Sequence, residues 1–249
     1  MTDNPRSAIW QIGLARLSGW ILPYRCVVCA LPAERLQDLC LDCELRLPWL
    51  KGVCEHCQES LPAGSSKPIC AACIVKPPAF DRMVSLFEYD FPVNALVQGL
   101  KFSDRTSFAR VFGELMAKHL EELFISQALP KPQVIVPVPL HKARLYERGF
   151  NQAEFIAVHV RSKLGVPMRA DLVLRTKSTE AQSSLGLDDR RHNVKQAFHL
   201  KKAMPYRHVA ILDDVVTSGN TVAELAKVLK QAGAETVQVW SVCKALSRK

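Results

Sequence analysis

One stretch near the C-terminus, HVAILDDVVTSGNT at residues 208–221, constrains the fold of this chain more than any other. It begins with the apolar, partly β-branched run Val209–Leu212, which is typical of a short buried parallel strand. We expect this strand to end at two adjacent carboxylates, Asp213 and Asp214. A turn rich in hydroxyl groups and a helical pattern, VAELAKVLKQAGAE, follow, and Gly233 ends that helix.

This arrangement has the chemistry of a site for a sugar phosphate. The backbone N–H groups at a helix N-terminus attract anions, and the hydroxyls of Thr217, Ser218 and Thr221 add donors. Carboxylates such as Asp213 and Asp214 accept hydrogen bonds from sugar hydroxyls or bind Mg²⁺. The turn has no lysine, so it is not a Walker A loop, and the chain has no G-x-G-x-x-G fingerprint. Alternatively, the acids only end a strand and the hydroxyls only cap a helix.

The cysteines form the second strong pattern. Eight of the nine occur in four C-x-x-C pairs, and two such pairs complete a Cys₄ zinc site with Zn–S distances of ~2.3 Å. Disulfides are not expected in a reducing cytosol, and four thiolates leave no open position, so both ions are predicted to be structural. We expect sequential rather than interleaved pairing, although the sequence leaves both open. The predicted ligands are Cys26, Cys29, Cys40 and Cys43 for one ion and Cys54, Cys57, Cys70 and Cys73 for the other.

The positive charge of the chain is concentrated in one segment. The formal net charge is +9, and residues 142–207 hold 14 basic against 6 acidic side chains. This excess suits an anionic ligand or a nucleic acid, although a solvated basic face has the same composition. No apolar run reaches the ~18 residues of a membrane span. Residues 8–22 resemble an amphipathic helix rather than a signal peptide, so we expect a cytoplasmic protein.

A second strand-and-anion pattern precedes the first. The run Val134–Val138 is typical of a buried strand, and a helix that ends near Leu164 follows it. Between the two lies a basic loop, which predicts a second anion site at a neighbouring strand end. The candidate contacts in this loop are His141, Lys142, Arg144 and Arg148. Lys101, in the segment GLKFSDR, could also reach a phosphate or could be a solvated surface lysine.

The remaining pattern predicts an α/β fold. Strands are expected at residues 83–89 and 236–242 and helices at 92–100 and 107–123, so that strands and helices alternate from residue 83 onward. Alternation of this kind implies a mainly parallel sheet whose ligands bind at the carboxyl ends of the strands. The proline-containing join at 76–81 divides the chain. We therefore expect a helix at 1–21, a double zinc ribbon at 22–80 and an α/β domain at 81–249.

Residues 208–221 resemble the phosphoribosyl-pyrophosphate (PRPP) motif of type I phosphoribosyltransferases. The segments PVPLHKARLYERGFNQAE and AQSSLGLDDRRHNVKQAF, together with the eight paired cysteines, are similar to those of one branch, the ComF family, which includes GntX-like proteins. The resemblance implies a type I phosphoribosyltransferase-like sheet flanked by helices after a double zinc ribbon. It also implies an association with DNA uptake and natural transformation, and a mobile loop near residues 175–194.

The resemblance further implies the ligands and the site. PRPP or another phosphoribosyl ligand would bind with Mg²⁺, beside two structural Zn²⁺ ions, and pyrophosphate would leave in exchange for an unidentified nitrogen acceptor. Asp213, Asp214 and Arg148 would act in catalysis. An alternative is a non-catalytic PRPP sensor that binds single-stranded DNA. The number of subunits is left open. The resemblance carries the ribose and phosphate contacts to Asp213, Asp214 and residues 217–221. The full set of candidate PRPP contacts is Lys101, His141, Lys142, Arg144, Asp213, Asp214, Val215, Val216, Thr217, Ser218, Gly219, Asn220 and Thr221.

Overall fold

The computed structural model describes residues 24–33, 35, 37–100, 106–177 and 196–246. The chain divides into two compact units, Met1–Leu47 and Pro48–Lys249. The second group of cysteines therefore lies in the same unit as the predicted sheet. The division into a zinc ribbon that ends at residue 80 and an α/β domain that follows it remains a prediction. The helix predicted over residues 1–21 lies outside the described residues.

The described part of the smaller unit is built around the first group of cysteines. The backbone of Arg25 forms an antiparallel bridge with Pro32, which folds the first C-x-x-C pair into a tight turn. A short helix, α2 (Leu41–Leu45), follows the second pair. The guanidinium of Arg35 joins the two halves, because it donates to the Glu44 carboxylate at 2.6 Å and to the carbonyl oxygen of Leu39 at 2.9 Å.

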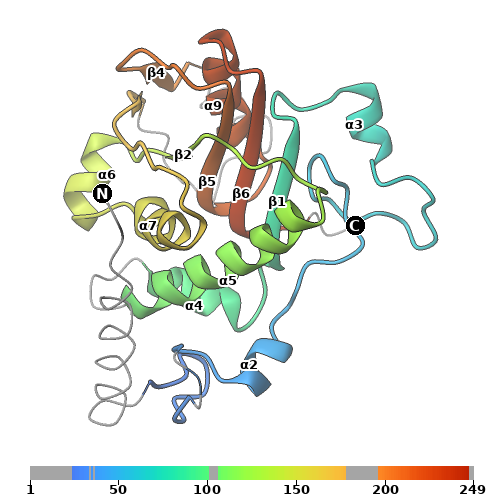
Figure 1. Ribbon diagram of the computed structural model, residues 1–249, viewed down its shortest axis with the longest axis vertical. Helices are drawn as coiled ribbons and strands as arrows, with labels where there is room; N and C mark the ends of the chain where they lie inside the picture. The colour runs from blue at the N-terminus through green and yellow to red at the C-terminus, as the bar shows by residue number, and fades with distance from the viewer. Residues whose placement is uncertain (1–23, 34, 36, 101–105, 178–195, 247–249) are drawn as a thin grey trace, which may run out of the picture. The chain divides into compact units, whose positions relative to one another are not determined.

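A four-stranded parallel sheet forms the centre of the larger unit (Figure 1). The strand order is β1-β6-β5-β2, and each neighbouring pair is parallel. This confirms the prediction of a mainly parallel sheet. The strands are β1 (Arg82–Glu88), β2 (Val134–Pro137), β5 (His208–Val216) and β6 (Thr236–Lys244).

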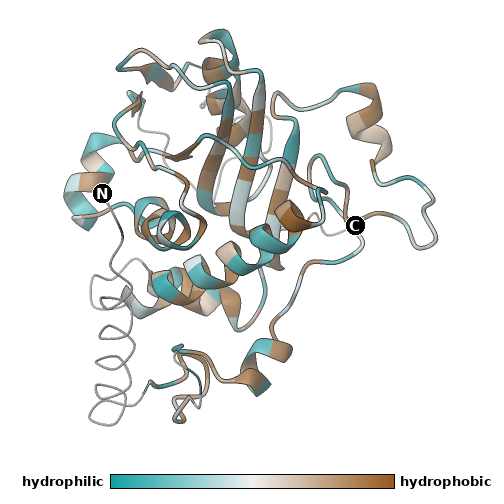
Figure 2. Ribbon diagram, in the orientation of Figure 1, coloured by the Kyte–Doolittle hydropathy of each residue, from teal (hydrophilic) through white to brown (hydrophobic). Residues whose placement is uncertain are grey.

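Helices cover both faces of this sheet (Figure 1). Alternate strand residues point to opposite faces, and Val209 and Ile211 belong to the same buried cluster as the apolar side of α9. On the other face, the Trp240 ring packs against Phe124 of α5 with centroids 6.2 Å apart. Helix α5 carries polar and apolar residues in alternation along its length (Figure 2). The helices are α4 (Val93–Gly99), α5 (Thr106–Ile125), α6 (Lys142–Arg148), α7 (Gln152–Leu164) and α9 (Asn220–Gln231).

Within the described ranges, no helix combines the length and the apolar character needed to cross a bilayer.

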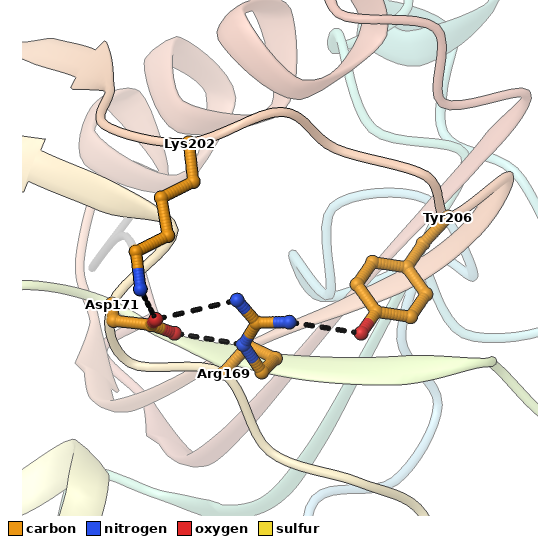
Figure 3. A network of polar contacts seen from close by, with 4 residues as sticks. All are labelled: Arg169, Asp171, Lys202 and Tyr206. Carbon is orange, nitrogen blue, oxygen red and sulfur yellow. Dashed lines mark hydrogen bonds and ion pairs between the residues drawn. The ribbon is translucent and has the colours of Figure 1, made fainter.

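A second, two-stranded antiparallel sheet lies next to the main one. It pairs β3 (Val173–Arg175) with β4 (Phe198–Leu200). A polar network lies at the end of this sheet where β3 begins and β4 ends. In this network, Arg169 donates to Asp171 at 2.8 and 3.2 Å and to the Tyr206 hydroxyl at 3.2 Å (Figure 3). Lys202 also pairs with Asp171, and these two cations hold the pKa of that carboxyl well below its usual range. The predicted mobile loop falls largely on residues 178–195, outside the described residues.

The segment that begins the larger unit lies along the edge of β1. The N–H of Glu88 donates to the carbonyl of Pro48 at 2.8 Å, and the N–H of Leu50 donates to the carbonyl of Leu86 at 2.9 Å. Between these bonds, the Trp49 and Phe87 rings pack against each other at a tilt of 52°, with centroids 4.6 Å apart. This pairing protects an otherwise open sheet edge. It also fixes the start of the second cysteine group, which ends in helix α3 (Ala71–Val75).

Candidate functional site at the carboxyl edge of the sheet

The acidic pair lies inside strand β5 and not after it. The sequence predicted that the strand ends at these acids, and this boundary was wrong, because β5 continues to Val216. The reason is the neighbouring strand β6, which pairs with β5 as far as the partners Val216 and Lys244. On the other side, the pairing with β2 reaches only Leu212, opposite Pro137. The acids are therefore held by β6 at the point where β2 has already ended.

The end of β2 places the basic segment at the same level as the acids. The N–H of Val138 donates to the carbonyl of Leu212 at 2.8 Å, one residue before Asp213. The chain then turns away from the sheet and enters α6. Because both strands are parallel, their carboxyl ends open on the same edge, where ligands of such sheets bind.

Asp213 and Asp214 are rigidly placed and differ in their environment. The Asp213 carboxylate accepts the N–H of Asp214 at 2.9 Å, and the Asp214 carboxylate accepts the N–H of Val215 at 2.9 Å. Burial, and then the neighbouring Asp214 charge, raise the pKa of Asp213 well above its usual range, while Arg175 partly opposes the shift. A cation at this position, such as Mg²⁺, would relieve the repulsion between the two carboxylates.

The turn after β5 leads directly into the N-terminus of α9. Gly219 adopts a left-handed conformation with φ of +77° and precedes α9 directly, and no side chain forms a capping hydrogen bond at this position. The first N–H groups of this twelve-residue helix are therefore not capped by the residue before it, and a helix N-terminus favours negative charge. Thr217 and Ser218 are exposed beside it. The structure thus brings Asp213, Asp214 and the predicted turn 217–221 together at one edge.

Arg175 adds a positive charge to this edge. Residue 175 forms a parallel backbone bridge with His141, so the end of β3 lies beside the start of α6. Its guanidinium lies over the Phe198 ring, 5.6 Å from the centroid. Burial lowers the pKa of Arg175, attraction to Asp213 raises it, and repulsion from Arg144 lowers it again. The charges of Asp213 and Arg144 therefore both act on Arg175.

The predicted basic loop is instead mostly helical. Residues Lys142–Arg148 form α6, because the sequence KARLYER consists largely of good helix formers and Gly149 ends the helix at φ of +76°. The His141 ring caps this helix by accepting the N–H of Ala143 at 3.3 Å. The Arg148 guanidinium donates to Gln152 of α7 at 3.3 Å, which directs it along the helix pair.

Two further predicted contacts fall in different places. Lys142 is exposed on the first turn of α6. Lys101 lies outside the described residues, as does the part of the predicted mobile loop at 178–195 that holds Arg190 and Arg191.

The cysteines form two separate tetrads, in the sequential pairing that was expected. In each tetrad, all four sulfur atoms lie within 4.8 Å of one another. The Sγ atoms of Cys29 and Cys40 are 3.9 Å apart, and those of Cys57 and Cys70 are 3.7 Å apart. Four sulfurs arranged as a tetrahedron around zinc lie about 3.8 Å apart for a Zn–S distance of ~2.3 Å. Both tetrads therefore fit the sites of a double zinc ribbon.

The second tetrad shows how the backbone stabilises a thiolate. Burial raises the pKa of Cys54, but hydrogen bonds from the N–H groups of Cys70, Cys57 and His56 outweigh it and lower this pKa to about 7. The N–H of Cys70 lies 3.2 Å from the Cys54 sulfur. Bonds of this kind are typical of zinc knuckles, where the metal requires deprotonated ligands.

One residue of this edge was missed by the sequence analysis. Lys244 ends β6 and is 2% exposed. Its ammonium donates to the carbonyl oxygen of Thr217 at 2.7 Å and pairs with Glu59, which lies two residues after Cys57. A lysine at the end of a strand is normally read as a solvated charge, so the sequence contains no signal for this position.

Comparisons with known proteins match the cysteine-rich segment to a family model and most of the chain to known relatives. Residues 17–74 match the model of the Double zinc ribbon domain. The chain is 36% identical over 226 residues to the DNA utilization protein YhgH of Salmonella typhi, covering 90% of this chain and 99% of that protein. It is 33% identical over 226 residues to Competence protein F of Haemophilus influenzae, covering 89% and 97%.

Among solved structures, the similarity is looser. A hypoxanthine phosphoribosyltransferase from Staphylococcus aureus aligns with a TM-score of 0.35 and 12% identity, over 54% of this chain and 64% of that one. A glutamine PRPP amidotransferase from B. subtilis aligns with a TM-score of 0.36 and 17% identity, over 55% and 26%. The two relatives named above have a higher sequence identity to this chain, and their alignments with it span almost the whole length of each relative. On their similarity, this chain belongs to the ComF family, the family of Competence protein F and the DNA utilization protein YhgH.

Proposed function

We propose that this protein binds PRPP together with Mg²⁺ at the carboxyl edge of its sheet and acts in the utilisation of DNA taken up by the cell. One observation carries the proposal. Strand β5 presents two adjacent carboxylates directly before a turn and a helix N-terminus that suit an anion. A sugar with hydroxyls on one side and a phosphate on the other matches this order of acceptors and donors.

Each part of the edge has a role in this proposal. Asp213 and Asp214 would accept hydrogen bonds from the ribose hydroxyls. The N–H groups and hydroxyls of residues 217–221 would hold the 5-phosphate. Arg175, and Arg144 whose charge acts on it, would face the pyrophosphate. Mg²⁺ supplies charge that stabilises this group when bound.

We further propose that the bound PRPP transfers its phosphoribosyl group to a nitrogen acceptor. The bond between carbon 1 and the pyrophosphate oxygen breaks, and a bond from carbon 1 to nitrogen forms. The oxygen keeps the bonding electrons and leaves as pyrophosphate, while the nitrogen gives up its proton. Positively charged groups such as Arg144 and Arg175 would stabilise the negative charge on the leaving group.

The two tetrads would each hold one structural Zn²⁺. All nine cysteines are free thiols, and eight of them are gathered in these clusters. A reducing compartment keeps such thiols available to a metal. On this ground we propose a cytoplasmic location.

Titration calorimetry with PRPP and Mg²⁺ tests the binding, and a screen of nitrogen bases for pyrophosphate release tests the transfer. We expect saturable binding that depends on Mg²⁺, and release only with the right acceptor. If PRPP binds but no acceptor releases pyrophosphate, the transferase part fails and a PRPP sensor remains. If PRPP does not bind at all, the proposal is wrong.

A second candidate function, contact with single-stranded DNA, is favoured by one feature of α6. The Tyr146 side chain is 93% exposed and lies one helical turn after the exposed Lys142. Residues four apart share one face of a helix, so an aromatic ring and a cation stand side by side. Proteins that bind single strands combine such stacking rings with positive charge.

Replacing this ring tests the second function. Tyr146→Ser should weaken binding of a short oligonucleotide about tenfold, since stacking contributes ~1–3 kcal/mol per base. Phe91, which is 75% exposed, provides a matched control, and Phe91→Ser should leave the affinity unchanged. Equal affinities for all three proteins, or no binding at low salt, would exclude this surface as a DNA contact.

A further inference from the structure

The ammonium group of Lys244 is buried and fully occupied. It has three donors and three acceptors within reach, namely the Glu59 carboxylate, the Thr217 carbonyl at 2.7 Å and the Ala245 carbonyl at 2.8 Å. The side chain is 2% exposed in the ion pair with Glu59. A buried ammonium is costly unless it is paired. The Lys244 ammonium therefore holds these three acceptors in position, because the loss of any one bond would leave a buried donor unsatisfied.

The first acceptor, Glu59, lies in the turn that carries Cys54 and Cys57 of the second cysteine tetrad. The C-x-x-C turn is closed by the N–H of Cys54, which donates to the carbonyl of Glu59 at 2.9 Å. Gln58 adds a bond from its side-chain amide to the Cys54 carbonyl at 3.2 Å, and its side-chain oxygen accepts the N–H of Ser85 in β1 at 3.4 Å. The position of the Glu59 backbone thus depends on the turn that presents Cys54 and Cys57 to a metal.

The second acceptor belongs to the proposed phosphate turn. Thr217 is the first residue after β5, and its side chain is exposed. Two bonds hold the turn from below: the one from Lys244 to the Thr217 carbonyl, and the one from the N–H of Ala245 to the Val216 carbonyl at 2.9 Å. The direction of the following N–H groups depends on this carbonyl, because the same peptide unit carries the N–H of Ser218.

We propose that Lys244 is a positioning residue that couples the second cysteine tetrad to the turn at residues 217–221, so that metal at this tetrad strengthens ligand binding by that turn. The proposal rests on the proposed PRPP site for its functional part. Without metal, the C-x-x-C turn loses its shape, Glu59 moves away, and the ammonium is left with two neutral acceptors. The turn then samples other orientations, and the helix N-terminus is less well ordered for an anion.

Hydrogen exchange at the backbone amides of residues 213–222 tests the coupling directly, in zinc-loaded protein without any ligand. Lys244→Met keeps the aliphatic stem and removes the ammonium, and it should speed exchange in this segment. Lys230 offers a matched control, because its ammonium also pairs with a carboxylate, Asp81 at 2.7 Å, and with a carbonyl, Glu235 at 3.3 Å. Lys230→Met should leave exchange in the segment unchanged.

A double-mutant comparison separates coupling from general loss of stability. Lys244→Met should weaken PRPP binding about tenfold, which corresponds to ~1.4 kcal/mol, and Glu59→Gln should weaken it less. Because Glu59 acts through Lys244, the double variant should bind no more weakly than Lys244→Met alone. All variants should retain two zinc ions.

The metal itself provides a second arm. Cys70→Ser, in the second tetrad, should speed exchange at 213–222, whereas Cys40→Ser, in the first tetrad, should not. If Lys244→Met does not fold, Glu59→Gln and Cys70→Ser decide the question by the same measurement. Unchanged exchange in the folded variants, or equal effects of Lys230→Met and Lys244→Met, would overturn the coupling. If the native protein does not bind PRPP, the proposed function fails, and the exchange data still decide this inference.

Discussion

The N–H of Val138 donates a 2.8 Å hydrogen bond to the carbonyl oxygen of Leu212, immediately before the acidic pair. One strand leaves the sheet at this bond and the other carries two carboxylates beyond it. The carboxyl edge of the sheet therefore has acidic groups on β5 and basic groups in the segment that follows β2. This juxtaposition is what the proposed binding of a sugar phosphate together with a divalent cation requires.

The raised pKa of Asp213 predicts a pH-dependent stability. The unfolded carboxyl titrates near 3.8 and the folded one well above it, so between these values the folded state binds more protons. The free energy of unfolding should then fall as pH rises through this window. Asp213→Asn removes the proton and should flatten this part of the curve. Chemical unfolding of both proteins from about pH 4 to about pH 8 measures the free energy of unfolding against pH. Parallel curves for the two proteins would contradict a raised pKa of Asp213 in the folded state.

The tetrads predict a zinc content of two ions per chain. Metal analysis of protein prepared without chelator should give about two equivalents, and Cys26→Ser or Cys70→Ser should each lose about one and lower the unfolding temperature. Cys243 is buried but belongs to neither tetrad, so Cys243→Ser should keep both ions and controls for the loss of a thiol. Native, folded protein with no zinc would rule out the double ribbon sites.

Two glycines with the same positive φ separate backbone strain from a role in ligand binding. Gly219 and Gly64 both have φ of +77°, and a Cβ on either would meet nothing closer than the Val216 side chain at 4.0 Å. Alanine at each position should cost ~1–2 kcal/mol of stability, because a left-handed conformation is strained for residues with a Cβ. Only Gly219→Ala should also weaken PRPP binding. Equal PRPP affinities in the two variants would argue against an anion at this turn.

Much of the fold could be predicted from local patterns. The strand runs at Val134 and Val209 are short, apolar and followed by helical periodicity, so their type and order were clear. The C-x-x-C spacing indicated sequential tetrads because each knuckle needs a nearby partner. These features depend on neighbours in the sequence, and they were confirmed.

The rest depends on partners that are distant in the sequence. The end of β5 is set by its pairing with β6 up to Lys244, which no local pattern reveals. The cluster of basic residues in α6 predicts a loop that binds an anion. The prediction is wrong because most residues of this segment are good helix formers. The contact of Lys244 with Glu59 joins residues 185 positions apart, and only the folded chain brings them together.

The most direct test of the account is PRPP binding by a protein that has lost both acidic charges. Asp213→Asn with Asp214→Asn keeps oxygen acceptors for the neighbouring N–H groups, so the fold should persist by circular dichroism and zinc content. Calorimetry with PRPP and Mg²⁺ should show at least about a hundredfold weaker binding than the native chain, since hydrogen bonds to charged groups contribute ~1.5–3 kcal/mol each. A folded double variant that binds PRPP as tightly as the native protein would contradict the central claim.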